Sequence, residues 1–280
     1  EKIYKIACGA NAQDYHWTEV LMKNAAPFMD GLSLHYYTLP TGNWQDKGSA
    51  TDFSESVWYD TMEKTLFMDE LIEKHSTIMD QYDPEKRIGL IVDEWGTWFN
   101  VEPGTVPGFL YQQNTIRDAL VAALNLNIFH RHCDRVQMAN IAQMVNVLQA
   151  MILTDGEKMV KTPTYYVFKM YQYHQDATFI QGSGNMPEKT DYTASIKEDK
   201  LTLSLCNYDL HEEKKVSFSL GEFTTLIKND LLTAEKMNDI NDFSKEEKVT
   251  IVPFENVKVE NNHVTCVLPA KSVVNLRFNK

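Results

Sequence analysis

Long apolar runs are missing from this sequence, and none approaches the roughly 18–20 residues that a helix needs to span a bilayer. The chain begins Glu1-Lys2-Ile3, charged and then apolar, which is unlike a signal peptide. Its four cysteines, at positions 8, 133, 206 and 266, are far apart and form no Cys-x-x-Cys motif. These shortages predict no transmembrane segment, zinc site or disulfide framework, and they leave the cellular compartment open.

Positive charge is also scarce, with 27 Lys and Arg against 39 Asp and Glu, which gives a net charge of −12. Such a chain repels phosphate backbones and anionic lipid headgroups, so we expect neither nucleic acid nor a membrane as a partner. Hydrophobic residues make up 43% and charged residues 24%, the composition of a globular protein. A length of 280 residues allows one large or two ordinary domains.

The first part of the chain alternates short apolar runs with longer amphipathic segments. Expected strands cover residues 3–8, 32–37, 88–92 and 138–141, and expected helices cover 15–26, 56–82, 112–129 and 165–174. This alternation is typical of βαβ units with a parallel sheet. Only four units are present, so the pattern fits either a small doubly wound sheet or half of a (β/α)₈ barrel.

The pattern changes after residue 175. Seven short runs follow, at residues 192–196, 201–206, 216–220, 225–227, 249–252, 264–268 and 273–278. Residues 198–200 have the composition of a tight turn between the first two. Short strands at this spacing predict a β-sandwich. We therefore expect an α/β domain at residues 1–175 and an all-β domain at residues 176–280.

Two adjacent acids, Asp93 and Glu94, follow the apolar run 88–92. In parallel sheets and barrels, functional groups gather at the carboxyl ends of strands, where a carboxylate can act as a nucleophile or a general base. The alternative is that these acids cap the next segment's backbone amides. Because neighbouring residues of a strand point to opposite faces, Asp93 is expected on the face opposite Glu94.

Aromatic residues surround these acids in the sequence. His35-Tyr36-Tyr37 ends the preceding strand, and Trp44, Trp95 and Trp98 lie in or near the following loops. A phenol can hold a carboxylate ionised and aimed, and aromatic faces stack on sugar rings. The alternative is that these rings fill the interior. Two amides after the last strand, Gln143 and Asn146, suit sugar hydroxyls or, equally, the satisfaction of a loop.

Residues 32–37, 89–96 and 139–147, in this order and before a sandwich ending Leu268-Pro269-Ala270-Lys271-Ser272-Val273-Val274, resemble the α-L-arabinofuranosidases of glycoside hydrolase family 51. The resemblance extends over nearly the whole chain, and Asp-Glu-Trp-Gly at 93–96 and Ala-Gln-Met-Val-Asn-Val at 142–147 are its most specific parts. In that family a (β/α)₈ barrel precedes a C-terminal β-sandwich, and terminal α-L-arabinofuranosyl groups are hydrolysed with retention. The resemblance implies that residues 1–175 form strands 5–8, the second half of a TIM barrel.

The resemblance also assigns roles to single residues. Glu94 matches the catalytic nucleophile. Tyr37 matches a tyrosine that contacts the nucleophile and the sugar, with Tyr36 as the other register. Gln143 matches a glutamine that hydrogen-bonds the arabinose. The remaining matched positions lie in the wall of the substrate site: His35 and Asn146.

The chain departs from the family by having no Gly-Asn-Glu stretch, which carries the general acid/base. We therefore expect a C-terminal portion that holds the nucleophile, is inactive alone, and needs the N-terminal half of the barrel as a partner. The implied substrate is an arabinofuranosyl-containing polysaccharide or oligosaccharide, and no metal or cofactor is implied. Family members often form homo-oligomers, so that assembly stays open. Two alternatives are another glycosidase on the same barrel and a non-catalytic carbohydrate-binding fragment.

Overall fold

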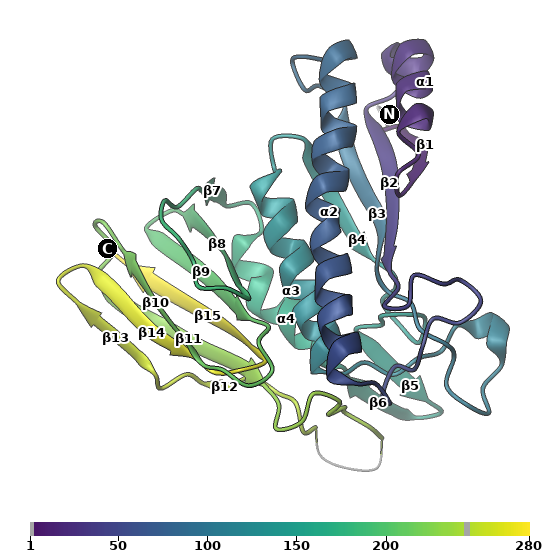
Figure 1. The fold of residues 1–280 in the computed structure, drawn as a ribbon. Coiled ribbons are helices and arrows are strands. Elements are labelled where there is room, and N and C mark those ends of the chain that lie inside the picture. The colour runs from purple at the N-terminus through teal and green to yellow at the C-terminus, as the bar shows by residue number, and fades with distance from the viewer. Residues whose placement is uncertain (1–2, 244–246) are drawn as a thin grey trace.

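The computed structural model describes residues 3–243 and 247–280, and it shows an α/β part beside an all-β part (Figure 1). The α/β part contains one parallel sheet of β1 (Ile6–Asn11), β2 (Gly31–Thr38), β3 (Gly89–Thr97) and β4 (Val136–Ile141), paired in that order. The sequence predicted all four strands and a parallel sheet. The fold class, α/β followed by a β-sandwich, is confirmed, whereas the assignment to half of a barrel stays a prediction.

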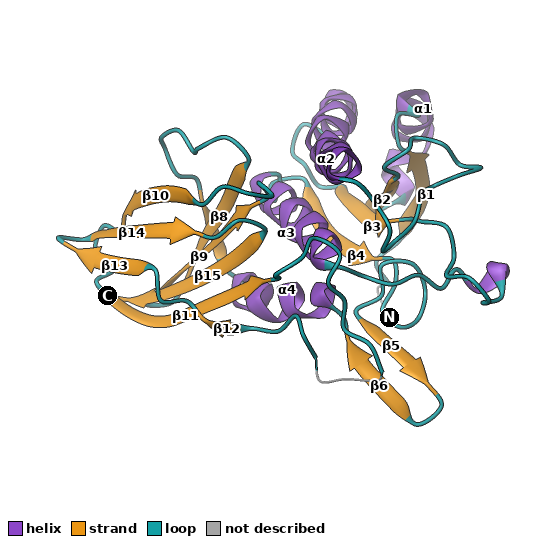
Figure 2. Ribbon diagram, turned by 60° about the horizontal axis from the view of Figure 1, so that its bottom comes forward, coloured by secondary structure: helices purple, strands orange, loops and turns teal. Residues whose placement is uncertain are grey.

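Helices follow the strands along the chain and pack beside the sheet (Figure 2). The α-helices are α1 (Tyr15–Ala25), α2 (Glu55–Tyr82), α3 (Ile116–Arg131) and α4 (Pro163–Tyr171). Three 3₁₀ turns, η1 (Ala26–Phe28), η2 (Pro107–Phe109) and η3 (Gln172–His174), and the hairpin of β5 (Ile152–Asp155) and β6 (Lys158–Lys161) complete this part. None of the described helices is long and apolar enough to cross a membrane.

The start of α3 differs from the prediction. The helix begins at Ile116, and not near residue 112, because Thr115 and Asp118 form a capping box. The Thr115 hydroxyl accepts from the helix backbone, and the Asp118 carboxylate accepts from the Thr115 N–H at 2.7 Å. Gln112 is thereby left outside the helix, with its side chain free to bond elsewhere.

The all-β part consists of two sheets. A six-stranded sheet has the order β12-β11-β15-β9-β8-β7, and a three-stranded sheet has the order β10-β14-β13. Their bounds are β7 (Thr178–Ile180), β8 (Thr190–Lys197), β9 (Lys200–Asn207), β10 (Lys214–Ser219), β11 (Thr225–Thr233), β12 (Val252–Pro253), β13 (Val257–Glu260), β14 (His263–Leu268) and β15 (Ser272–Asn279). The predicted turn at residues 198–200 joins β8 to β9, and the sequence missed the short strands β7 and β13.

The six-stranded sheet packs against α3 and α4, so the core is continuous between the two parts. Cys206 and Val273 of the sheet belong to the same buried cluster as Val167 and Met170 of α4. The other face of the sheet covers a second core that it shares with the three-stranded sheet. The predicted division of the chain after residue 175 stays a prediction, and apolar packing crosses it.

A buried histidine, His174, links η3 to the six-stranded sheet. Its Nδ1 is hydrogen-bonded with Ser195 Oγ at 2.7 Å, and its Nε2 with Ser204 Oγ at 2.8 Å. Burial, with the neighbouring His130 and Arg277, lowers the pKa of His174 to about 3. The imidazole is therefore neutral in the folded protein near neutral pH.

This burial predicts acid sensitivity. The unfolded chain binds a proton at His174 near pH 6.5 and the folded chain only near pH 3, so the free energy of unfolding must fall as pH drops through this window. We expect His174→Asn to make that slope shallower by up to about 1.4 kcal/mol per pH unit, measured by urea denaturation at several pH values. Substitution of the exposed His16 by Asn is the control, and an equal change in both variants would contradict the prediction.

Gly9 lies where the register of β1 shifts against β2, between Ala7 and Ala10. A Cβ atom at this position would stand 1.5 Å from the backbone carbonyl oxygen of Ser33, so only glycine allows the two strands to approach.

We expect Gly9→Ala to lower the free energy of unfolding by about 1–3 kcal/mol, because a backbone atom cannot move aside as a side chain can. Chemical denaturation measures the change. Gly108→Ala is the control, since, apart from the neighbouring stretch of chain, no heavy atom of the described residues lies within 4 Å of its Cβ position. Equal stability of the two variants would show that β1 can shift to make room.

Candidate active site

The candidate site lies at the carboxyl ends of β2 and β3. The two strands pair in parallel, with His35 opposite Glu94 and Tyr37 opposite Gly96, after a register shift between Ser33 and His35. The pairing of β3 with β4 also shifts, between Val92 and Trp95. Both irregularities flank the two acids, so the strand does not alternate regularly where they stand.

Asp93 and Glu94 consequently contact the same imidazole ring. His35 Nε2 lies 3.1 Å from Asp93 Oδ1, and His35 Nδ1 lies 3.5 Å from Glu94 Oε2. The expectation that Asp93 points to the opposite face of the strand is therefore wrong, because it assumed a regular strand. All three side chains are partly exposed, which leaves the two carboxylates accessible to a ligand.

Ser33, His35 and Tyr37 point to the same side of β2, as residues two apart in a strand do. The Ser33 hydroxyl donates to Asp93 Oδ1 at 2.6 Å, and the Tyr37 hydroxyl donates to Glu94 Oε2 at 2.8 Å. Each acid is thus held by one hydroxyl and by the histidine between them. The sequence analysis missed Ser33, although period-two alternation from His35 would have pointed to it.

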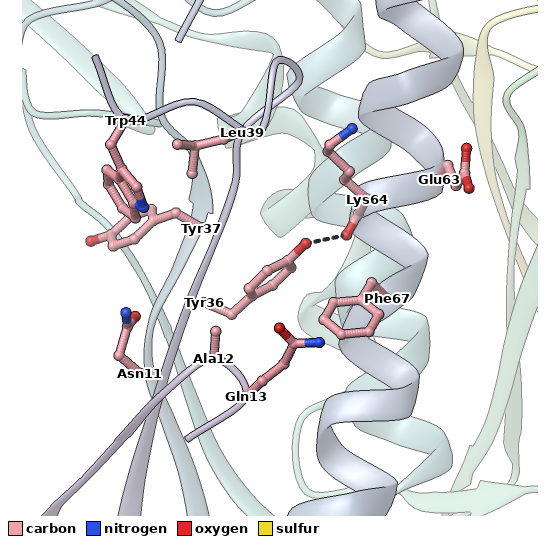
Figure 3. Close-up of a pocket in the computed structure, with 11 residues that line it drawn as sticks. Asn11, Ala12, Gln13, Tyr36, Tyr37, Leu39, Trp44, Glu63, Lys64 and Phe67 are labelled. Atoms are coloured by element: carbon pink, nitrogen blue, oxygen red, sulfur yellow. Dashed lines mark hydrogen bonds between the residues drawn. The ribbon is translucent and has the colours of Figure 1, made fainter. Parts of the chain in front are cut away.

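The two adjacent tyrosines point in different directions (Figure 3). The Tyr36 hydroxyl donates to the backbone carbonyl of Lys64 on α2 at 2.6 Å, and its ring meets Phe67 at 5.8 Å. Tyr37 instead reaches Glu94. Burial, the hydrogen bond to Glu94 and that carboxylate's charge raise the pKa of Tyr37 well above its ordinary value. The phenol therefore remains a donor to Glu94 near neutral pH.

Two indole rings extend the site from Tyr37. The ring of Trp98 lies 4.9 Å from that of Tyr37, edge to face, and Trp44 lies 5.3 Å from Trp98 in the same geometry. Trp44 is half exposed and presents an aromatic face to solvent. The Lys47 ammonium stands 5.6 Å from the centre of the Trp98 ring.

The expectation that Trp95 joins this lining is wrong. Trp95 is fully buried and packs between Phe129 and Phe168. It fills the core between the sheet and the helices, which was the alternative interpretation for the aromatic residues.

A cavity of about 580 Å³ opens beside the tyrosines, between the ends of β1 and β2 and helix α2 (Figure 3). Polar and aromatic side chains line it together, among them Asn11, Gln13, Tyr37, Trp44 and Lys64. Its mixture of rings with hydrogen-bonding groups suits a sugar ligand, and Tyr37 connects it to Glu94, which is not itself among the lining residues.

Gln143 and Asn146 line a different cavity, of about 630 Å³, together with the loop that contains Phe109. Gln143 is exposed. The Asn146 amide donates to Thr154 Oγ1 at 2.8 Å, and its oxygen accepts from the Thr154 N–H at 2.7 Å. Asn146 therefore ties its loop to β5, as the loop-satisfying alternative proposed, and the sugar-contact roles of both amides stay predictions.

Together these contacts define a carboxylate held rigidly at the end of a parallel strand, beside aromatic rings. Such a carboxylate can attack a sugar carbon or take a proton, which is the chemistry of glycoside hydrolases. In the described residues, no group of three or more His, Cys, Asp or Glu could hold a metal ion.

Comparison with known proteins identifies the family. The profile described as Alpha-L-arabinofuranosidase C-terminal domain matches residues 93–272. The chain is 47% identical to the intracellular exo-alpha-L-arabinofuranosidase of Bacteroides ovatus, over 99% of its own length and 56% of that protein's. The chain belongs to the α-L-arabinofuranosidase C-terminal domain family, and it spans about half the length of the curated relatives that it matches.

Solved structures agree. The chain superposes on the GH51 arabinofuranosidase from Xanthomonas axonopodis pv. citri with a TM-score of 0.93 and 47% identity, covering 100% of this chain and 59% of that one. A family 51 α-L-arabinofuranosidase from Bifidobacterium longum gives a TM-score of 0.81 at 22% identity, covering 99% and 60%, and at that identity it shows the fold alone.

Proposed function

We propose that this chain is the C-terminal part of a retaining α-L-arabinofuranosidase, with Glu94 as the nucleophile. The observation that carries the proposal is the convergence of the Tyr37 hydroxyl and the His35 ring on the Glu94 carboxylate at the end of β3. A nucleophile needs to be aimed, and two fixed neighbours supply that aim without blocking the exposed side of the carboxylate.

In the proposed reaction, Glu94 attacks the anomeric carbon of a terminal arabinofuranosyl group as the glycosidic oxygen leaves with a proton. The result is a covalent arabinosyl-enzyme, which water then hydrolyses. Tyr37 donates to Glu94 Oε2, so the other carboxylate oxygen is left to attack. Trp98 and Trp44 offer apolar faces against which the sugar can lie.

A retaining hydrolase also needs an acid/base carboxyl roughly 5–5.5 Å from the nucleophile. Asp93 does not suit this role, because Ser33 and His35 already hold its carboxylate. We assign it instead to the orientation of His35. The acid/base would come from the other half of a (β/α)₈ barrel, of which β1 to β4 would be strands 5 to 8. The substrate would be an arabinofuranosyl-containing oligosaccharide or polysaccharide.

The nucleophile assignment predicts the effect of Glu94→Gln in the complete protein that carries this chain. Turnover of an aryl α-L-arabinofuranoside should fall by about 10⁴-fold or more, because the amide cannot form the covalent intermediate. Activity is measured as release of the aryl group and of free arabinose. Azide should partly restore the turnover of Glu94→Ala, because it can enter the space left by the carboxylate and attack the anomeric carbon. The product is then an arabinosyl azide of inverted anomeric configuration.

Glu260→Gln, at the exposed end of β13 in the three-stranded sheet, is the matched control and should keep wild-type rates. Wild-type rates in Glu94→Gln would refute the nucleophile role. A complete wild-type protein that releases no arabinose from any arabinofuranoside would refute the proposed function itself.

The geometry of the tyrosine pair predicts a second outcome. Tyr37→Phe removes the only hydroxyl that the structure places on Glu94 among the described residues, so kcat should fall about 10–100-fold. Tyr36→Phe removes a hydroxyl of the same kind that faces α2, and its kcat should stay within about twofold of wild type. Steady-state kinetics on one aryl arabinofuranoside compares them. Equal losses in the two variants would contradict the assigned register.

A further inference from the structure

Among residues 3–243 and 247–280, no strand pairs with β3 beyond Trp95 on the side of β4. Strand β4 ends at Ile141, whose partner on β3 is Trp95. Beyond this point Trp98 still donates its N–H to the Thr38 carbonyl of β2, at 3.2 Å. On the opposite edge the backbone of residues 97–99 must find other partners, because buried N–H and C=O groups are costly when left unpaired.

Two buried glutamine side chains supply those partners. Gln149 Oε1 accepts from the Thr97 N–H at 2.8 Å, and Gln112 Oε1 accepts from the Phe99 N–H at 2.8 Å. Gln112 Nε2 also donates to the Thr97 carbonyl at 3.2 Å. Gln112 and Gln149 are 1% and 0% exposed, so water does not compete for these bonds. The two amides act as a short substitute for a neighbouring strand.

Gln149 also connects three further elements. Its Nε2 donates to the Asp118 carbonyl in the first turn of α3 at 2.7 Å and to Thr164 Oγ1 of α4 at 3.1 Å. Its backbone N–H donates to the Ala142 carbonyl at 3.0 Å. Gly96, at φ +132°, makes this approach feasible, since a Cβ there would lie 3.0 Å from Gln149 Oε1.

The segments that Gln149 holds carry Trp98 of the candidate site and the start of the loop that contains Gln143. Trp98 lies between Thr97 and Phe99, whose N–H groups are bound by the two glutamines, and its ring packs edge to face on Tyr37. Ala142 directly precedes Gln143. A shift of Gln149 would therefore move the Trp98 ring and the Gln143 loop relative to Glu94 without touching any of these side chains.

We infer that Gln149, assisted by Gln112, is a positioning residue for the proposed arabinofuranosidase reaction, setting the placement of Trp98 against Tyr37, which donates to Glu94. The inference rests on the proposed function. It extends the machinery from residues that face the sugar to a fully buried amide that would act on the sugar only through the backbone segments it holds.

A double-mutant cycle in the complete protein tests this role. Gln149→Met preserves the length of the side chain and removes its hydrogen bonds. It should lower kcat/KM for an aryl α-L-arabinofuranoside with a good leaving group by about 10-fold or more when Trp98 is present. In a Trp98→Ala background the same substitution should cost less than about 3-fold, because the ring to be positioned is gone.

Gln149→Glu is the conservative variant. One carboxyl oxygen can still accept from the Thr97 N–H, so its kcat/KM should lie between those of wild type and Gln149→Met. Should Gln149→Met fail to fold, Gln112→Met enters the same cycle, since it releases Phe99 on the other side of Trp98.

Asn207→Leu is the matched control for general loss of buried amide bonds. Asn207 is fully buried in the sandwich and donates to the carbonyls of Glu212, Leu268 and Pro269. Asn207→Leu should lower the free energy of unfolding and change kcat/KM by the same small factor with or without Trp98. If the wild-type protein is active and Gln149→Met lowers kcat/KM by the same factor with Trp98 as with Trp98→Ala, the positioning role is overturned. A wild-type protein without arabinofuranosidase activity would overturn the proposed function and this role with it.

Discussion

The parallel pairing of β2 with β3 is the constraint on which the candidate site depends. It sets His35 opposite Glu94 and places the Tyr37 hydroxyl on the same carboxylate. The pairing is irregular, and the irregularity brings Asp93 round to the histidine that Glu94 also contacts. A regular ladder would have separated the two acids and left Ser33 without its carboxylate partner.

The sequence predicted the elements well where one period dominates. The four strands of the parallel sheet and their helices follow from apolar runs and amphipathic spacing. Strand ends pointed to residues 35–37 and to the acid pair 93–94, and the choice of Tyr37 and Glu94 within them came from the family resemblance. The direction of Asp93 could not be read, because a register shift depends on the partner strand. The prediction for Trp95 was wrong for a related reason, since the sequence does not show whether a tryptophan beside an acid faces a ligand or a helix.

The buried polar contacts were harder to predict from the sequence. The sequence pattern places Gln112 at the start of a helix, but the capping box at Thr115 and Asp118 starts the helix later. The amide of Gln112 is therefore available to Thr97 and Phe99. Gln149 lies in a loop whose sequence gives no period at all. Gln112 and Gln149 form hydrogen bonds with residues 13 and 52 positions away in the chain, and such pairs can be identified only once the fold is known.

Among the described residues, β1 and β4 each pair on one side only. Each outer strand thus offers a row of backbone groups to a further segment, and in the proposed barrel both edges would have to pair with the other half for the sheet to close. In the proposed barrel, exchange of this part of the chain between relatives would therefore depend less on Glu94 and its neighbours than on the pairing along these two edges. A chimera that keeps every site residue would then close only if the backbone groups of β1 and β4 found matching strands.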